Sequence, residues 1–208
     1  MKNKIIMVLI LLCTALSYGQ KKKSKAKTAG RPAPAALAKA DNLTAEIIKG
    51  NFYLFVNSKA KKDTIAIKAV DDSSLPKEAV LKAFTAKGTP LYLLTWKEES
   101  TAKTDLKTEV KTILFSEVYD IASKAKLFSN QQVTVNSTEK VFLDRLKNAS
   151  ETQEKIRREG FEFVLTPEGD IVQKNKTQQN NFAFNPAEKK YEAKPGPSAV
   201  SQPKKKKA

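Results

Sequence analysis

The chain has 208 residues, a formal net charge of +16, a single cysteine at position 13 and no histidine. The missing histidines exclude a Ser-His-Asp triad and histidine-ligated zinc, and one cysteine cannot form a disulfide within the chain. Paired carboxylates, Ser-Lys dyads and oxygen-ligated metals remain possible, but they are less common. The composition therefore predicts a protein that is not an enzyme and that uses no cofactor or metal.

The first 19 residues have the pattern of a secretory signal peptide. Two early lysines precede an uncharged apolar run over residues 5–16, which is shorter than the roughly 20 residues of a membrane-spanning helix. Small residues at positions 17 and 19 fit a signal-peptidase site before Gln20. We therefore expect cleavage to remove residues 1–19 together with Cys13, leaving no transmembrane segment. The mature chain is then expected in the periplasm or outside the cell, most simply in the envelope of a Gram-negative bacterium. An uncleaved membrane anchor is the alternative.

Positive charge is concentrated at both ends of the mature chain. Residues 20–42 contain seven basic residues and one acidic residue, and residues 188–208 contain seven and two, whereas residues 43–187 contain 22 and 19. Segments of Lys, Ala, Pro and Gln bury too little apolar surface to offset their loss of conformational entropy. We therefore predict a disordered linker over 20–42, one domain over 43–173, and a disordered tail over 174–208 in which the aromatics between 180 and 191 can pack on the domain.

Lysines in the two terminal segments are candidate anion-binding residues. Such clusters attract phosphates and anionic head groups through counterion release, without reading a sequence. Lipopolysaccharide, phospholipid and extracellular DNA are the candidate ligands, and a pair of solubilising linkers is the simpler interpretation. The residues concerned are Lys21, Lys22, Lys23, Lys25, Lys27, Lys204, Lys205, Lys206 and Lys207.

The first half of the domain predicts two strands, a helix and two more strands. Residues 52–56 and 63–70 are β-branched, aromatic or alternating, with a polar loop between them, and indicate a hairpin. Pro76 follows acidic and hydroxyl residues and begins an apolar stripe, which predicts a helix over about 76–84 that Gly88 ends.

Residues 90–96 and 107–119 then predict paired strands. Val110, Thr112, Leu114 and Val118 are expected on one face of the second strand, with Ile113 and Phe115 on the other.

The second half predicts short strands, a long helix and a final hairpin. Residues 127–128 and 133–135 suggest a short strand pair. Apolar residues at 4-3 spacing, with opposite charges four residues apart, favour one helix over 136–160. The alternative is a strand over 139–146 followed by a helix over 149–159. Residues 161–172 predict a strand, a Thr-Pro-Glu-Gly turn and a strand.

Two groups of side chains are candidates for a functional site. The acidic pairs Asp71-Asp72 and Glu98-Glu99 each consist of adjacent residues, which point to opposite faces of a strand and do not make a carboxylate pair alone. The aromatic residues of the predicted strands could form a ligand platform, but a domain of this size needs them in its core. They are Phe52, Tyr53, Phe55, Tyr92 and Trp96.

Together these patterns predict an α+β protein, in which a small antiparallel sheet packs against two helices between basic, disordered ends. The predicted function is that of an exported, non-catalytic interaction or accessory domain of the cell envelope. Its partner would be an unidentified envelope protein or an anionic polymer, with no sequence-specific nucleic-acid binding. Binding of an anionic polymer or membrane surface through the lysine-rich tails is the first alternative, and a carboxylate-dependent hydrolase is the second.

Overall fold

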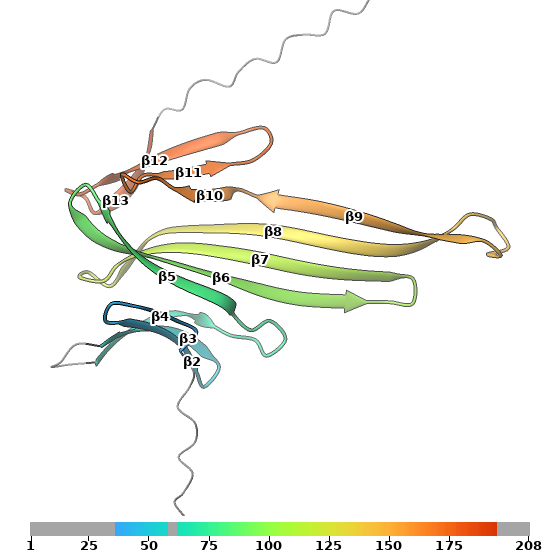
Figure 1. Cartoon of the computed structure of the whole chain (residues 1–208), viewed down its shortest axis with the longest axis horizontal. Coiled ribbons are helices and arrows are strands. Elements are labelled where there is room, and N and C mark those ends of the chain that lie inside the picture. The colour runs from blue at the N-terminus through green and yellow to red at the C-terminus, as the bar shows by residue number, and fades with distance from the viewer. Residues whose placement is uncertain (1–35, 58–61, 195–208) are drawn as a thin grey trace, which may run out of the picture. The chain divides into compact units, whose positions relative to one another are not determined.

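The computed structural model describes residues 36–57 and 62–194, which all belong to one compact unit that spans residues 34–208. The regular structure of these residues consists entirely of strands, in three antiparallel sheets (Figure 1). Sheet A contains β1 (Ala38–Ala40), β2 (Leu43–Ile48), β3 (Asn51–Asn57) and β4 (Lys62–Ala69). Sheet B contains β5 (Lys77–Ala86), β6 (Thr89–Lys103), β7 (Lys107–Asp120), β8 (Ala125–Phe142) and β9 (Ser150–Gly160). Sheet C contains β10 (Glu162–Leu165), β11 (Ile171–Lys174), β12 (Gln179–Asn185) and β13 (Lys190–Lys194).

Sheet B is the central layer, and one of its faces packs on sheet A. Trp96 of β6 and Phe115 of β7 stack with ring centroids 4.7 Å apart, and Phe52 of β3 meets Trp96 edge-on at 5.4 Å. Leucines of both sheets complete this cluster, and most of its members are almost fully buried. Aromatic pairs of this geometry add to the stabilisation that comes from burying their area.

The opposite face of sheet B packs on sheet C. Leu91 and Val118 of sheet B and Ile171 of sheet C are fully buried in a second cluster. Phe128 of β8 lies within 5.7 Å, centroid to centroid, of Phe182 and Tyr191 in sheet C. Sheet B therefore has an apolar layer on each side.

The predicted α+β class is wrong, and the helix expected over 76–84 is strand β5. Leu81 belongs to the cluster on the sheet A side, whereas Phe84 packs in the cluster on the sheet C side. A strand that is buried on both faces loses the alternation of apolar and polar residues, so its sequence can imitate a helical stripe. Lys87 and Gly88 do not end a helix: their positive φ values of 46° and 83° form the tight turn from β5 to β6.

The helix expected over 136–160 is also wrong, because this segment contains the end of β8, a loop and β9. Residues 132–142 of β8 pair with residues 150–160 of β9 over the whole length of β9. The alternative was right that a strand includes residues 139–142, but residues 149–159 are not helical. Lys155 is one of the charged residues expected to form an ion pair along a helix. Its ammonium group instead lies 3.8 Å from the carboxylate of Glu139 on the neighbouring strand.

Part of each predicted disordered segment is ordered. The composition of residues 174–208 predicts a tail, but residues 174–194 complete sheet C with β12 and β13, and β1 lies within the predicted linker. Phe182, Phe184 and Tyr191 provide the apolar surface that makes this possible, because they pack on sheet B. Residues 20–35 and 195–208 lie outside the described residues.

Several local predictions are confirmed. The hairpins over 52–70 and 161–172 are β3–β4 and β10–β11, and in the second the Gly169 amide donates to the Thr166 carbonyl at 3.0 Å. The two faces predicted for residues 107–119 are also correct, since Phe115 packs toward sheet A and Val118 toward sheet C.

A single crossover joins sheet B to sheet C at Gly160. This residue has a φ of +81°, and a Cβ atom there would lie 2.4 Å from the carbonyl oxygen of Gln131. Beside it, buried Asn130 of β8 donates to the Phe161 carbonyl at 2.9 Å and accepts from Gln173 of β11 at 2.8 Å. Asn130 thus connects the central sheet to sheet C at the point where the chain passes between them.

Candidate interaction surface

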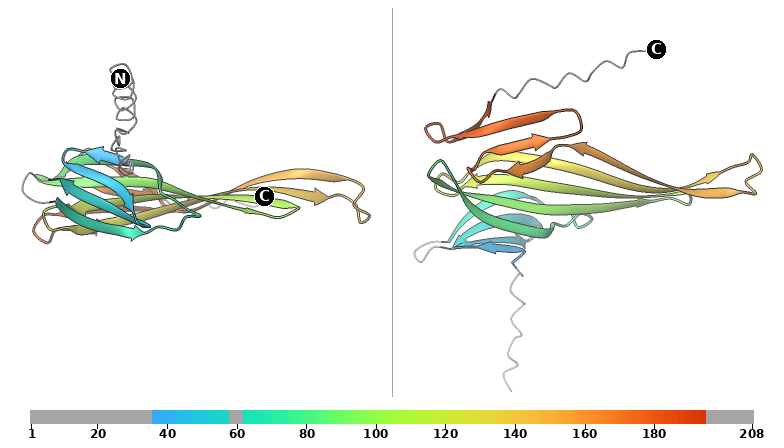
Figure 2. Two further views of the ribbon diagram at one scale, coloured as in Figure 1. Left: turned by 90° about the horizontal axis from the view of Figure 1, so that it is seen from below. Right: turned by 45° about the horizontal axis from the view of Figure 1, so that its top comes forward.

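Four strands of sheet B continue past the region that sheets A and C cover. The apolar clusters include β6 only as far as Trp96 and β7 only from Ile113 onward. Beyond these points β6, β7, β8 and β9 form a single-layer sheet, seen as the long strands of Figures 1 and 2. We call this part, together with residues 113 and 114 that adjoin the covered region, the extension; it comprises residues 99–103, 107–114, 132–142 and 150–160. Sheets normally bury at least one face, so an uncovered sheet of this length is unusual.

The face of the extension on the sheet A side is charged. Register pairs on β7 and β8 place Lys107 opposite Glu139, and Glu109 opposite Ser137. The next pair on this face places Lys111 opposite Val135, which is buried. Lys111 and Arg157 line a small depression together with Val133 and Val135, so their long side chains cover the apolar residues between them.

The opposite face has an uncharged centre, and we call it the open face. Four consecutive register pairs of β7 and β8 contain no ionisable side chain: Thr108–Thr138, Val110–Asn136, Thr112–Thr134 and Leu114–Gln132. Charged residues flank this centre, Glu99 and Lys103 on β6 and Glu154 and Arg158 on β9. Protein–protein interfaces are likewise depleted of charged residues at their centre and polar at their rim.

A groove of about 1240 Å³ lies at the base of the open face, where it meets sheet C. Leu114, Ile156 and Phe163 provide its apolar lining, and Ile156 is 68% exposed. Lys174 and the turn from Asn175 to Thr177 form the opposite wall. Asn175 holds this turn, since its side chain accepts from the amides of Thr177 at 2.9 Å and Gln178 at 2.8 Å.

Both edges of the extension lack a neighbouring strand among the described residues. β5 pairs with β6 only as far as Lys97, and β9 is the last strand of its sheet. Free strand edges can add a further strand, and charged side chains oppose indiscriminate pairing. β9 contains six charged residues among its 11, so its edge is protected in this way.

Two carboxylates on the sheet A side of sheet B are buried, and each has a cation beside it. Glu98 lies 2.7 Å from the Lys68 ammonium and accepts from the Trp96 indole at 2.9 Å. Glu117 lies 2.9 Å from Lys126 and also accepts from Tyr119. Burial, followed by the hydrogen bond to Glu117, raises the pKa of Tyr119 above its ordinary value.

These two carboxylates do not converge on one pocket. Leu94 is the register partner of Glu117 and Ile113 that of Glu98, so the glutamates are four positions apart along the strands, or about 13 Å. Glu99 follows Glu98 on the opposite face, as the alternation of a strand predicts. Among the described residues, no three acidic side chains lie close enough together to hold a metal ion.

Asp120 closes the turn between β7 and β8. It accepts from the Ser123 hydroxyl at 2.6 Å and from the Ala122 amide at 3.0 Å. Burial acts to raise the pKa of Asp120, but these hydrogen bonds and the nearby Lys189 outweigh it and lower the pKa below its ordinary value. The other acidic pair, Asp71-Asp72, lies in a loop and precedes no helix. There Ser73 donates its amide to Asp71 at 3.0 Å.

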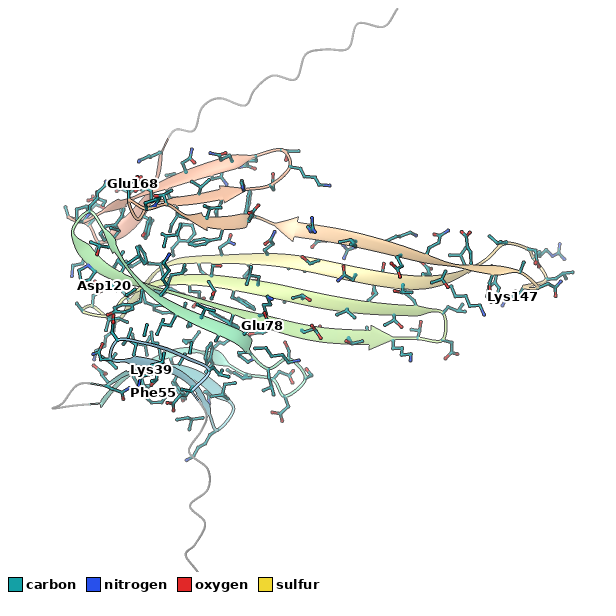
Figure 3. The ribbon with its side chains drawn as sticks, viewed as in Figure 1. Lys39, Phe55, Glu78, Asp120, Lys147 and Glu168 are labelled. Carbon is teal, nitrogen blue, oxygen red and sulfur yellow. The ribbon has the colours of Figure 1, made fainter. Side chains whose placement is uncertain are left out.

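The predicted aromatic group divides between core and surface. Phe52 and Trp96 are buried in the core, whereas Tyr53 and Phe55 point to the other face of β3, with centroids 5.8 Å apart. Figure 3 labels Phe55 on sheet A. Tyr92 donates to Asp41 at 3.1 Å. The lysines predicted to bind anions, at 21–27 and 204–207, lie outside the described residues.

No helix in the described ranges is long and apolar enough to cross a membrane. The chain matches no protein-family model, no curated protein and no solved structure.

Proposed function

We propose that this chain is a non-catalytic interaction domain of the cell envelope, which binds a partner protein through the open face and the groove at its base. The observation that supports the proposal is the uncharged centre of the open face, on strands that sheets A and C leave uncovered. Sheets A and C bury the rest of sheet B, so folding alone does not require β6–β9 to continue past them. The leader-like segment over residues 1–19 supports the envelope location.

The asymmetry between the two faces supports one binding side. On β7 the sheet A side alternates lysine and glutamate at positions 107, 109 and 111, which favours contact with water, and these residues lie opposite Glu139, Ser137 and Val135 of β8. The open face presents threonine, valine and leucine at the equivalent positions. A partner can cover such a surface without desolvating charges, and removing charges from water is the costly step in forming an interface.

Site-specific photo-crosslinking in cells that make the protein tests this proposal. A photoreactive residue at Thr112 on the open face should crosslink to a partner, and one at Lys111 on the opposite face should not. Thr134→Lys places a charge in the centre of the open face and should abolish the crosslink. Ser137→Lys is the matched control, because it adds the same charge to the other face of the same strand. Equal crosslinking from both faces, or a crosslink that survives Thr134→Lys, would contradict the proposal.

A second variant separates this function from binding through the tails. It lacks residues 20–35 and 195–208, and the deletion begins at 195 because β13 ends at Lys194. We expect this variant to keep its partner at low and at high salt. Loss of the partner on tail deletion, with no effect of Thr134→Lys, would assign binding to the lysine-rich tails.

A further inference from the structure

The loop between β8 and β9 exposes two leucines beside a cluster of cations. Leu143 is 62% exposed and Leu146 is 79% exposed. The loop lies at the far end of the extension, where Figure 3 labels Lys147. We call residues 140–149 the tip.

The leucines are held in place by a well-bonded loop. Leu143 donates its amide to the Ala149 carbonyl at 3.0 Å, and Lys147 donates to the Asp144 carbonyl at 3.2 Å. The Asp144 side chain accepts from the amides of Asn148 at 3.1 Å and Ala149 at 2.8 Å. Because the loop is fixed by its own backbone, the exposure of the leucines is part of its folded conformation.

Within the tip, cations outnumber carboxylates, and Glu139 and Glu151 border it on β8 and β9. The tip contains three cations, Lys140, Arg145 and Lys147, against the single carboxylate of Asp144. The backbone hydrogen bond from Asn148, followed in importance by that from Ala149, lowers the pKa of the Asp144 carboxyl group. The same bonds direct the carboxylate toward the backbone of the loop. The ammonium groups of Lys140 and Lys147 lie 5.6 Å and 5.4 Å from the centre of the Phe142 ring.

We propose that the tip docks on an anionic phospholipid surface, with Leu143 and Leu146 inserted among the acyl chains. The cations on either side of the leucines would then meet the lipid phosphates, and each basic residue near such a surface raises affinity roughly fivefold. Apolar side chains with basic neighbours are the composition of segments that lie in a membrane interface. The uncharged centre of the open face ends at Thr138, before the tip begins.

The size of the tip favours lipid over a protein partner. Two leucines on one narrow loop offer far less area than the roughly 1000 Å² that a stable protein interface buries. A lipid surface accepts a small convex group without a matching pocket. It also provides negative charge around each inserted side chain, which complements the cations of the tip.

Fluorescence from single labelled cysteines tests the insertion. Cys13 is the only natural cysteine, so Cys13→Ser allows one label to be placed by Leu146→Cys or, as a control, by Val80→Cys. Val80 is 57% exposed on β5, at a site remote from the tip in sequence and in strand register. Both proteins keep the full chain and therefore the same lysine-rich ends, so adsorption through those ends affects both equally.

The expected result is a blue shift of an environment-sensitive dye at position 146 with phosphatidylcholine–phosphatidylglycerol vesicles, and none at position 80. Phosphatidylcholine vesicles alone should give a much smaller shift. In unlabelled protein, Leu143→Asn with Leu146→Asn should weaken binding to the anionic vesicles at least tenfold, whereas Val80→Asn should not. Unchanged Trp96 fluorescence confirms that each variant is folded.

Three results would overturn the proposal. One is sedimentation with the vesicles without a blue shift at position 146, which would place adsorption elsewhere on the chain. Another is unchanged affinity in the double asparagine variant. The third is a blue shift that appears only on addition of envelope protein and not of lipid, which would make the tip a protein-binding loop.

Discussion

Replacing Gly160 by alanine should separate the two costs of adding a side chain at the crossover from sheet B to sheet C. The first cost is conformational, because φ is +81° and a left-handed backbone costs an L-residue about 1–2 kcal/mol. The second is steric. The new Cβ would lie 2.4 Å from the Gln131 carbonyl oxygen, so β8 or β9 must move by about 1 Å to reach van der Waals contact. Such overpacking costs about 1–3 kcal/mol, which gives about 2–5 kcal/mol in total.

Gly88→Ala is the matched control for the conformational cost. Gly88 has a φ of +83°, and nothing lies within 4 Å of a Cβ atom added there. Urea denaturation followed by Trp96 fluorescence should therefore show a loss of about 1–2 kcal/mol for Gly88→Ala and a clearly larger loss for Gly160→Ala. At a slope of about 2 kcal/mol per molar urea, the Gly160 midpoint should fall by about 1–2.5 M. Equal midpoints for the two variants would refute the steric argument.

Three further predictions concern the buried polar groups. Lys68→Met leaves Glu98 buried without its cation and should lower the free energy of unfolding, measured by urea denaturation, by about 2–3 kcal/mol. The loss is smaller than for a fully enclosed pair because Lys68 is partly exposed. Adding Glu98→Gln to this variant should recover part of the loss. The pKa of Tyr119 is raised in the folded protein, so the stability of the wild type should fall as the pH rises above 10, and Tyr119→Phe should make that fall shallower. The pKa of Asp120 is lowered in the folded protein, so the stability it contributes is present above pH 3.8 and lost as the pH falls below it. Asp120→Asn should therefore flatten the acid side of a stability profile measured by thermal unfolding.

Each of these predictions has a result that would contradict it. Unchanged stability of Lys68→Met would mean that water, or the Ser74 hydroxyl 3.5 Å from the Glu98 carboxylate, satisfies Glu98 without the lysine. Identical alkaline slopes for the wild type and Tyr119→Phe would mean that the hydroxyl reaches solvent. An acid profile of Asp120→Asn that superimposes on that of the wild type would show that the turn does not depend on the charged carboxylate.

The two hairpins, and the assignment of β7 side chains to the two faces of the sheet, could be predicted from the sequence because both depend on neighbouring residues. Thr166 to Gly169 encodes its turn through the fixed φ of Pro167 and the positive φ that Gly169 adopts. Residues 107–119 alternate clearly because β7 has different surroundings on its two faces. These features need no knowledge of distant contacts.

The two helix predictions fail for different reasons, because β5 lies between two apolar layers whereas β9 is exposed. In β5, Leu81 and Phe84 pack on opposite layers, and their spacing resembles one helical stripe. In β9, charges four residues apart imitate helical ion pairs, although most of the strand is exposed and needs no apolar pattern. Composition also hides the second half of sheet C, since Phe182, Phe184 and Tyr191 stand in a segment that is otherwise rich in asparagine, glutamine and lysine.

The open face was only half visible in the sequence. The uncharged alternate positions of β7, from Thr108 to Leu114, can be read directly from the chain. Their meaning depends on β8, which brings Gln132, Thr134, Asn136 and Thr138 beside them. A helix over 136–160, as the sequence pattern predicts, excludes that pairing for residues 136 and 138. The tip cannot be predicted for the same reason. A continuous helix over 136–160 would contain Leu143 and Leu146 and would leave no loop there.

The order of the strands has a consequence for how the chain folds. Every neighbouring pair in all three sheets is consecutive along the chain, from β1–β2 to β12–β13. Each pairing therefore joins segments that follow one another along the chain, which lowers the entropy lost in closing each loop relative to a sheet with crossover connections and favours faster folding. Sheet A can pair as soon as residue 69 is available, sheet B after residue 160, and sheet C last. A chain delivered from its N-terminus can thus form each layer before the next one arrives, and it needs no late segment to complete an early sheet.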